Sequence, residues 1–252
     1  MFRQYLILFL LVLGCKEKSR FNKSIQRGDL IITGHFLNDT ILDDTISYST
    51  LDGKLIRKEF YVNGKQNGWQ IMFYSNRSIK AYELFENGLK NGDSYYFDTL
   101  GRLVYSDFSY YNLTVGPVIF YDTSGNPNKY FFSNLQNEDL LVIDYKNWKG
   151  VSSIVSSCIN FTSNKIKLED GRSGIQIILY MINPPRLSFE YSVVKSKLNN
   201  ADKGFTTLQT VKKDFPFKVL ELPLLDSLEE YSIMLTVYDS LIDKKTVIYK
   251  SL

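Results

Sequence analysis

Few side chains in this sequence have the chemistry of a catalyst. His35 is its only histidine, and Cys15 and Cys158 are its only cysteines. A nucleophile activated by histidine would have to use His35, yet no G-x-S-x-G motif marks a partner serine. Catalysis by His35 with Cys158 is therefore disfavoured against a surface or half-buried histidine. One histidine and two cysteines are also too few for a His/Cys metal cluster.

The acidic residues do not suggest a site either. Ca²⁺ prefers oxygen ligands, but the D-x-D-x-D-G spacing of a calcium loop is missing. Turns or solvated strand faces are the expected positions of Asp39, Asp43, Asp44 and Asp52. Glu229 and Glu230 are adjacent in an expected loop, whereas glycoside hydrolysis needs two carboxylates across a cleft. The sequence therefore predicts no catalytic residue, no metal ion and no cofactor.

Cys15 ends an apolar N-terminal segment. Residues 1–15 read MFRQYLILFLLVLGC, the pattern of a secretory signal. The end of this segment resembles the lipobox of bacterial lipoproteins, which implies cleavage before Cys15 and lipid on its side chain. We expect a signal peptide over residues 1–14, and the alternative is an ordinary signal in which Cys15 is incidental. More than one acyl chain would anchor the protein stably to a membrane.

The next stretch, residues 15–29, is charged and aperiodic, and we expect it to be a flexible tether. The chain would then be a lipoprotein of the cell envelope. Lys16 and Glu17 lack the aspartate that favours inner-membrane retention in enteric bacteria, so the outer membrane is favoured, facing the periplasm or the surface. Cys158 would be a lone, buried thiol. Thirty basic and 27 acidic residues are evenly spread, without the basic stripe that nucleic-acid binding needs.

Aromatic residues give the one positive indication of function. The chain has 18 tyrosines and 17 phenylalanines, a composition that favours strands. Aromatic-rich β surfaces bind sugars and partner proteins. The candidate binding residues are Trp69, Tyr74, Tyr95, Tyr105, Tyr111 and Tyr121. The alternative is that most of these rings fill a thin core.

A repeated segment between Thr40 and Leu135 must position these rings. Gly68, Gly92 and Gly116 are 24 residues apart. Gly53, Gly101 and Gly125 follow the same 24-residue spacing, with Arg77 at the position between Gly53 and Gly101. Such a period is typical of repeat arrays. Each repeat contains two short runs bounded by turn residues, which predicts β-hairpins that stabilise one another by stacking.

Two slots are apolar in every repeat, one holding Phe60, Leu84, Phe108 and Phe132 and the other Tyr48, Met72, Tyr96 and Phe120. We expect both slots to face a shared core and Glu59, Glu83 and Asp107 to face water. The predicted fold is all-β: an antiparallel hairpin array over residues 30–135, followed by a β-sandwich over residues 136–252.

The segments Asn67–Tyr74 and Phe85–Phe97 resemble the MORN-repeat variants, in which an F-x-N-G-x-x-x-G unit recurs. Bacterial lipoproteins and the YwqK-family antitoxins carry such arrays. The resemblance covers about residues 40–135, with Asp44 replacing a glycine in the first repeat and Asn112–Val115 departing in the last. It implies a hairpin array with a binding or scaffolding role.

Beyond residue 135 the period stops, and short runs separated by turn residues predict the sandwich. Tyr231–Asp239 alternates and follows a loop, which resembles strand F of immunoglobulin-like or fibronectin type III domains with Tyr231 as the tyrosine corner. We therefore expect a non-catalytic binding or scaffolding lipoprotein that contacts the membrane through its lipid and a protein or glycan through its repeats. The alternatives are an immunity-like protein that neutralises a toxin and an enzyme acting on envelope polymers.

Overall fold

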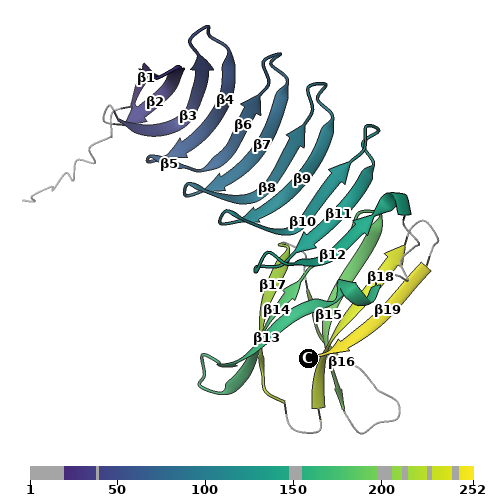
Figure 1. The fold of residues 1–252 in the computed structure, drawn as a ribbon. Coiled ribbons are helices and arrows are strands. Elements are labelled where there is room, and N and C mark those ends of the chain that lie inside the picture. Colours follow the sequence, from purple (N-terminus) through teal and green to yellow (C-terminus); the bar gives the residue numbers. More distant parts are fainter. Residues whose placement is uncertain are drawn as a thin grey trace, which may run out of the picture.

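Antiparallel strands in three sheets make up the protein (Figure 1). The structure, a computed structural model, describes residues 20–37, 40–147, 155–197, 206–211, 215–225, 229–239 and 244–252. Within these ranges the helical elements are two short 3-10 turns, η1 (Tyr145–Asn147) and η3 (Val155–Cys158). The all-β prediction is confirmed. The expected signal peptide and Cys15 lie outside the described residues.

A twelve-stranded sheet, which we call the array, takes up the first half of the chain. Each strand pairs with the next in sequence, except that the short β5 pairs with β4 and β4 continues to β6 (Figure 1). Its strands are β1 (Arg20–Arg27), β2 (Leu30–Leu37), β3 (Ile41–Thr50), β4 (Leu55–Val62), β5 (Lys65–Gln66), β6 (Gly68–Phe73), β7 (Ile79–Glu86), β8 (Leu89–Phe97), β9 (Leu103–Tyr110), β10 (Leu113–Tyr121), β11 (Pro127–Ser133) and β12 (Asp139–Asp144).

One five-residue turn recurs along the array and explains the spacing of Gly53, Gly101 and Gly125. In the turn from Tyr74 to Ser78, Arg77 N–H donates to Tyr74 O at 2.9 Å and Tyr74 N–H donates to Ser78 O at 2.8 Å. Equivalent bonds close the turns 50–54, 98–102 and 122–126. The fourth residue of each turn has a positive φ, 79° at Gly53 and 70° at Arg77. Glycine adopts this backbone conformation without a steric cost, so it recurs at this slot.

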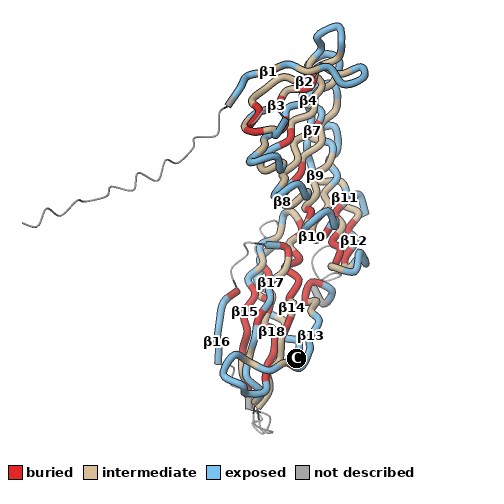
Figure 2. The backbone as a smooth tube through the Cα atoms, turned by 90° about the vertical axis from the view of Figure 1, so that its left-hand side faces the viewer, coloured by how far each residue is buried: buried red, intermediate tan, exposed pale blue. Residues whose placement is uncertain are grey.

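The two apolar slots lie on opposite faces of the array, so the prediction of one shared core is wrong. Arg57 pairs with Tyr48 across β3 and β4. Phe60 lies three residues beyond Arg57, and alternate residues of a strand point to opposite faces. Because the array is a single layer of strands in its middle, each face is covered only by neighbouring side chains (Figure 2).

The carboxylates expected in water are largely buried instead. Glu59 is 4% exposed, and the side chains of Glu83 and Asp107 are 14% and 11% exposed. They share a face with Tyr96, because Ala81 pairs with Tyr96 and Ser94 pairs with Asp107. The tyrosines and one lysine on that face bond to them, which compensates for their loss of water.

Both ends of the array extend beyond the expected limits. The segment expected to be a tether contains β1, which pairs with β2 along its whole length. Ile25 packs against the buried cluster that contains Ile32, whereas Phe21 is 46% exposed. The other residues of β1 are polar, as suits an edge strand. At the other end β12 continues the array past residue 135, because Leu141 and Ile143 alternate and are both buried.

Two smaller sheets follow. One has the order β13-β14-β17 and the other β16-β15-β18-β19. Their bounds are β13 (Asn160–Lys167), β14 (Ser173–Tyr180), β15 (Leu187–Lys197), β16 (Thr206–Val211), β17 (Phe217–Pro223), β18 (Glu229–Asp239) and β19 (Lys244–Ser251). Inward residues of both sheets, among them Ile177 and Ile233, form one core. The Tyr231 hydroxyl donates to Pro223 O at 3.0 Å, the bond that a tyrosine corner makes.

The core of the smaller sheets continues into the end of the array. Tyr130, Phe132, Leu141 and Ile143 from β11 and β12 belong to the same buried cluster as the residues of β14, β15 and β18. Figure 2 shows these buried segments next to one another where the two parts meet. Residue 135 is therefore no break in the packing, and the last hairpin of the array closes one end of the C-terminal core.

Candidate functional site

One face of the array carries neighbouring aromatic rings, and we call it the aromatic face. Trp69 on β6, Tyr82 on β7 and Tyr95 on β8 define it. The Trp69 ring lies 6.1 Å from the Tyr82 ring, nearly perpendicular to it, and 6.3 Å from the Tyr95 ring. Tyr82 pairs directly with Tyr95 in the strand register. Edge-to-face geometry is the favoured packing of such rings.

The aromatic face continues on both sides of this cluster. Phe97 packs edge-on against Tyr82 at 5.9 Å. Tyr121 lies with its hydroxyl 3.4 Å from the hydroxyl of Ser106, the residue that pairs with Tyr95. Trp69, Tyr95 and Tyr121, three of the six candidate binding residues, are thus on one surface that spans β6 to β10.

The aromatic face is open to solvent at these strands. Trp69 is 42% exposed and Phe60, on the same face of β4, is 38% exposed. Tyr82, Tyr95, Phe97 and Tyr121 are half-buried. An isolated exposed apolar residue is ordinary, but neighbouring ones rimmed by polar residues mark contact surfaces.

The other three candidates lie elsewhere. Tyr105 is on the opposite face, stacked 4.1 Å from Tyr96. Tyr74 is at a strand end, where its hydroxyl donates to Phe97 O at 2.8 Å. Tyr111 is in the turn between β9 and β10 and is 46% exposed. The alternative that the rings serve packing therefore applies to Tyr105 and Tyr74.

Sequence reasoning missed Tyr82 and Phe97 as members of the aromatic face. The signal that could have found them is alternation: Tyr82 and Leu84 alternate with Glu83, as Tyr95 and Phe97 alternate with Tyr96. Expected exposure at single array positions, the basis for the six candidates, does not show which residues pair from one strand to the next.

The opposite side, which we call the ladder face, is defined by Gln70, Glu83, Lys90, Tyr96 and Asp107. The Gln70 amide donates to Glu83 at 2.7 Å, and the Tyr96 hydroxyl donates to the other Glu83 oxygen at 2.7 Å. Lys90 Nζ lies 3.2 Å from Asp107, 3.6 Å from Glu83 and 2.8 Å from the Tyr96 hydroxyl. Burial and the bond to Glu83 raise the pKa of Tyr96 above its usual range. The side chains that define the ladder face are thus joined in one polar network.

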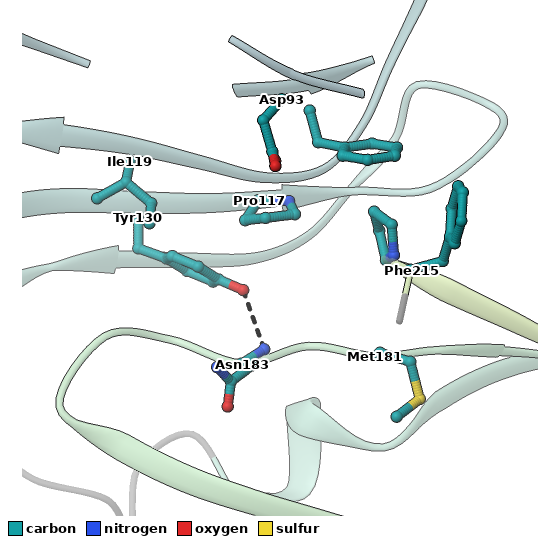
Figure 3. Close-up of a pocket in the computed structure, with 9 residues that line it drawn as sticks. Asp93, Pro117, Ile119, Tyr130, Met181, Asn183 and Phe215 are labelled. Atoms are coloured by element: carbon teal, nitrogen blue, oxygen red, sulfur yellow. Dashed lines mark hydrogen bonds between the residues drawn. The ribbon is translucent and has the colours of Figure 1, made fainter. Parts of the chain in front are cut away.

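A cavity of about 290 Å³ lies where the aromatic face meets the C-terminal sheets (Figure 3). From the array come Asp93, Phe108, Pro117, Ile119 and Tyr130, and from the C-terminal part come Met181, Asn183, Phe215 and Pro216. Phe108 and Phe215 pack edge-to-face at 5.7 Å. Partial burial of its carboxyl group, with the Asp107 carboxylate as a second cause, raises the pKa of Asp93.

Of the residues considered for catalysis and metal binding, His35 and Asp44 lie close together on β2 and β3, whereas Cys158 lies in the C-terminal core. His35 Nδ1 is 4.0 Å from an Asp44 carboxylate oxygen on the surface of β2 and β3. Cys158 is fully buried, and burial raises the pKa of its thiol to about 12, so it is not an activated nucleophile. Within the described ranges no three His, Cys, Asp or Glu side chains gather as metal ligands would.

Comparisons of the chain with protein-family models, with curated proteins and with solved structures return no match. Among the described residues no helix has the length and apolar character needed to span a bilayer.

Proposed function

We propose that this protein is a non-catalytic binding or scaffolding module of the cell envelope, held at a membrane by lipid on Cys15. In this proposal the aromatic face contacts the partner, which is a protein or a glycan. The observation that carries it is the neighbouring row of Trp69, Tyr82 and Tyr95, which is partly open to solvent on one face of the array.

The physics of this surface favours contact. Tryptophan and tyrosine present a large apolar area with one polar group and few rotatable bonds, so little conformational entropy is lost when they bind. Here the rings are further fixed by one another and by the strand register, so the surface is preorganised. Both a sugar ring and an apolar side chain fit such a row.

The test is capture of partners from intact envelopes with the whole lipidated protein as bait. The double variant Trp69→Ala with Tyr95→Ala should lose the captured partner, because each truncation removes aromatic contact area, at a cost on the order of 1 kcal/mol or more each. The variant Tyr111→Ala removes an exposed ring outside the aromatic face and should capture as well as the parent protein. Equal capture by all three proteins would contradict the proposal.

The anchor is tested separately. Cells fed radiolabelled palmitate should label the parent protein, and Cys15→Ala should abolish the label because no other residue has the lipobox position. Label that stays on Cys15→Ala would rule out lipidation at this residue. A soluble Cys15→Ala protein that still captures the partner would separate anchoring from binding.

A further inference from the structure

The described lining of the cavity between the array and the C-terminal part combines apolar side chains with the Asp93 carboxyl group. Phe108 on β9 and Phe215 before β17 provide aromatic walls, and Met181 adds an apolar, polarisable side chain. Figure 3 shows the Asp93 carboxyl group directed toward Pro117. Among the described residues that line the cavity there is no lysine or arginine.

The polar groups of the cavity have unused bonding capacity. In the part of the chain that the structure describes, the Asp93 carboxylate has neither a hydrogen bond nor an ion pair. The Tyr130 hydroxyl accepts a hydrogen bond from Asn183 N–H at 3.1 Å, which leaves its own proton free to donate (Figure 3). Asp93 is an exposed residue, so its carboxylate is open to a cation that enters the cavity, and covering it with a ligand is costly unless that ligand pairs its charge.

We propose that this cavity binds an alkylammonium group. The Asp93 carboxylate attracts the charge, and Phe108, Phe215 and Met181 contact the methylene chain. An anion would be repelled by Asp93, and a neutral apolar ligand would bury the carboxylate without compensation. A metal cation needs several oxygen ligands, whereas the described lining residues include one carboxylate, that of Asp93. Aromatic walls also favour an organic cation over a neutral molecule of the same shape.

The size of the cavity limits the ligand. At about 290 Å³ it is at the small end of ligand pockets, enough for one short alkyl chain with its ammonium group. Two sources supply this chemistry: a free alkylamine, or the lysine side chain of a partner. This site goes beyond the proposed function, because contact on the aromatic face does not require the cavity to be filled.

The test uses the full chain and ligand-observed NMR with three probes: n-butylammonium, Nα-acetyl-lysine N-methylamide, and n-butanol as the uncharged match. We expect saturable binding of the ammonium probes with Kd values on the order of millimolar, and n-butanol at least about fivefold weaker. Stronger binding of n-butylammonium would assign a free amine, and stronger binding of the blocked lysine would assign a partner's side chain. Either result supports the alkylammonium site.

Asp93→Asn keeps the shape of the side chain and removes its charge. It should weaken both ammonium probes about fivefold or more and leave n-butanol unchanged. Glu169→Gln, which removes an exposed carboxylate from the β13–β14 turn, is the matched control and should change nothing. Absence of saturable binding, equal binding of n-butanol, or an unchanged affinity in Asp93→Asn would each overturn the proposal. Circular dichroism of both variants confirms that they are folded.

Discussion

At the scale of single residues, the turn that recurs every 24 positions has one exception that can be tested. Arg77 takes the slot that glycine fills at Gly53, Gly101 and Gly125, and it keeps the left-handed backbone conformation with φ of 70°. A non-glycine residue pays about 1–2 kcal/mol in this conformation. A glycine variant would remove this strain, but part of the gain in stability would be offset by the greater conformational entropy of its unfolded chain.

Arg77→Gly should therefore stabilise the protein, by up to about 1 kcal/mol, as measured by urea denaturation. The reciprocal variant Gly101→Arg puts the strain into the equivalent turn of the next repeat and should destabilise by a similar amount. Nothing lies within 4 Å of a Cβ placed at Gly101, so backbone strain alone is changed there. A destabilising Arg77→Gly would mean that the arginine side chain makes contacts that outweigh its strain.

Asp93 illustrates a residue whose environment opposes its charge. The folded protein raises its pKa from the usual 3.8 through partial burial and then through Asp107. A raised pKa means that the folded state favours the protonated form. The contribution of this carboxyl group to the free energy of unfolding is therefore fully present below its unfolded pKa. The contribution is lost as pH rises from about 4 through the raised value.

Asp93→Asn is neutral at every pH and should be slightly more stable than the parent protein at pH 7. Since Asp93 is exposed to solvent, screening reduces the effect, and we expect a rise in Tm of about 1–2 °C. The gain should shrink as pH is lowered toward 4, because the parent protein then becomes neutral at this position. Thermal denaturation of both proteins across that range measures it, and a gain that is independent of pH would exclude a charge effect.

At the scale of elements, the strands of the array are joined by side chains as well as by backbone bonds. Glu83 on β7 accepts from Gln70 on β6 and from Tyr96 on β8. Lys90 then connects Glu83 with Asp107 on β9. Since both carboxylates are mostly buried, Lys90 is the counter-ion that permits them to stay charged.

Lys90→Met keeps most of the side-chain volume and removes the charge. It should destabilise by about 3–5 kcal/mol in urea denaturation, because two buried carboxylates lose their counter-ion. Adding Asp107→Asn to Lys90→Met should recover part of the loss, so the two substitutions should be strongly non-additive. Simple addition of the two effects would show that the ladder face is no network but a set of independent contacts.

The elements also show what the sequence could and could not predict. The 24-residue period identified equivalent positions, and from it the hairpins, the recurring turn and the all-β class followed. The period does not say which face an equivalent position takes, because both faces of a single-layer sheet are half-covered. Glu83 therefore looked like a water-facing residue, and its partners lie 13 residues away in either direction, across a strand pairing.

The candidate site was predictable to the same extent. Trp69, Tyr95 and Tyr121 were recognisable as aromatic array positions, but their gathering on one face depends on register. The cavity was beyond sequence reasoning, since it joins Asp93 and Tyr130 to Met181 and Phe215, from segments with no common pattern. The Tyr231 bond was predictable because it is local, spanning eight residues to Pro223.

At the scale of the whole molecule, the array and the C-terminal sheets are packed as one body. Tyr110 contacts Phe217 edge-on at 5.2 Å, and Phe108 contacts Phe215 edge-on at 5.7 Å. Gly116 on β10 lies directly against Pro216, so that a Cβ there would be 2.3 Å from the proline Cβ. This junction fixes the direction in which the array, with its aromatic face, projects from the C-terminal part (Figure 1).

Two glycines with the same backbone conformation allow this junction to be tested. Gly116 and Gly125 both have φ of 81°, but a Cβ at Gly125 has nothing within 4 Å. Alanine therefore adds the same backbone strain at both sites, and only Gly116→Ala forces the array away from Pro216. We expect Gly116→Ala to be less stable than Gly125→Ala by about 1–3 kcal/mol, the cost of overpacking.

The same pair distinguishes a coupled molecule from two independent parts. If packing at the junction couples the two parts, peptides from β7–β9 and from β14–β18 should open together in the parent protein and in Gly125→Ala. Amide hydrogen exchange should then show similar protection for both sets of peptides. Gly116→Ala should uncouple these openings, so that the array peptides exchange faster while the C-terminal peptides keep more of their protection. Because β7–β9 are not changed by the substitution, faster exchange there would have to come from the lost support. Equal exchange patterns in the two alanine variants would mean that the array stands without the C-terminal sheets, and that its aromatic face owes its orientation to the hairpins alone.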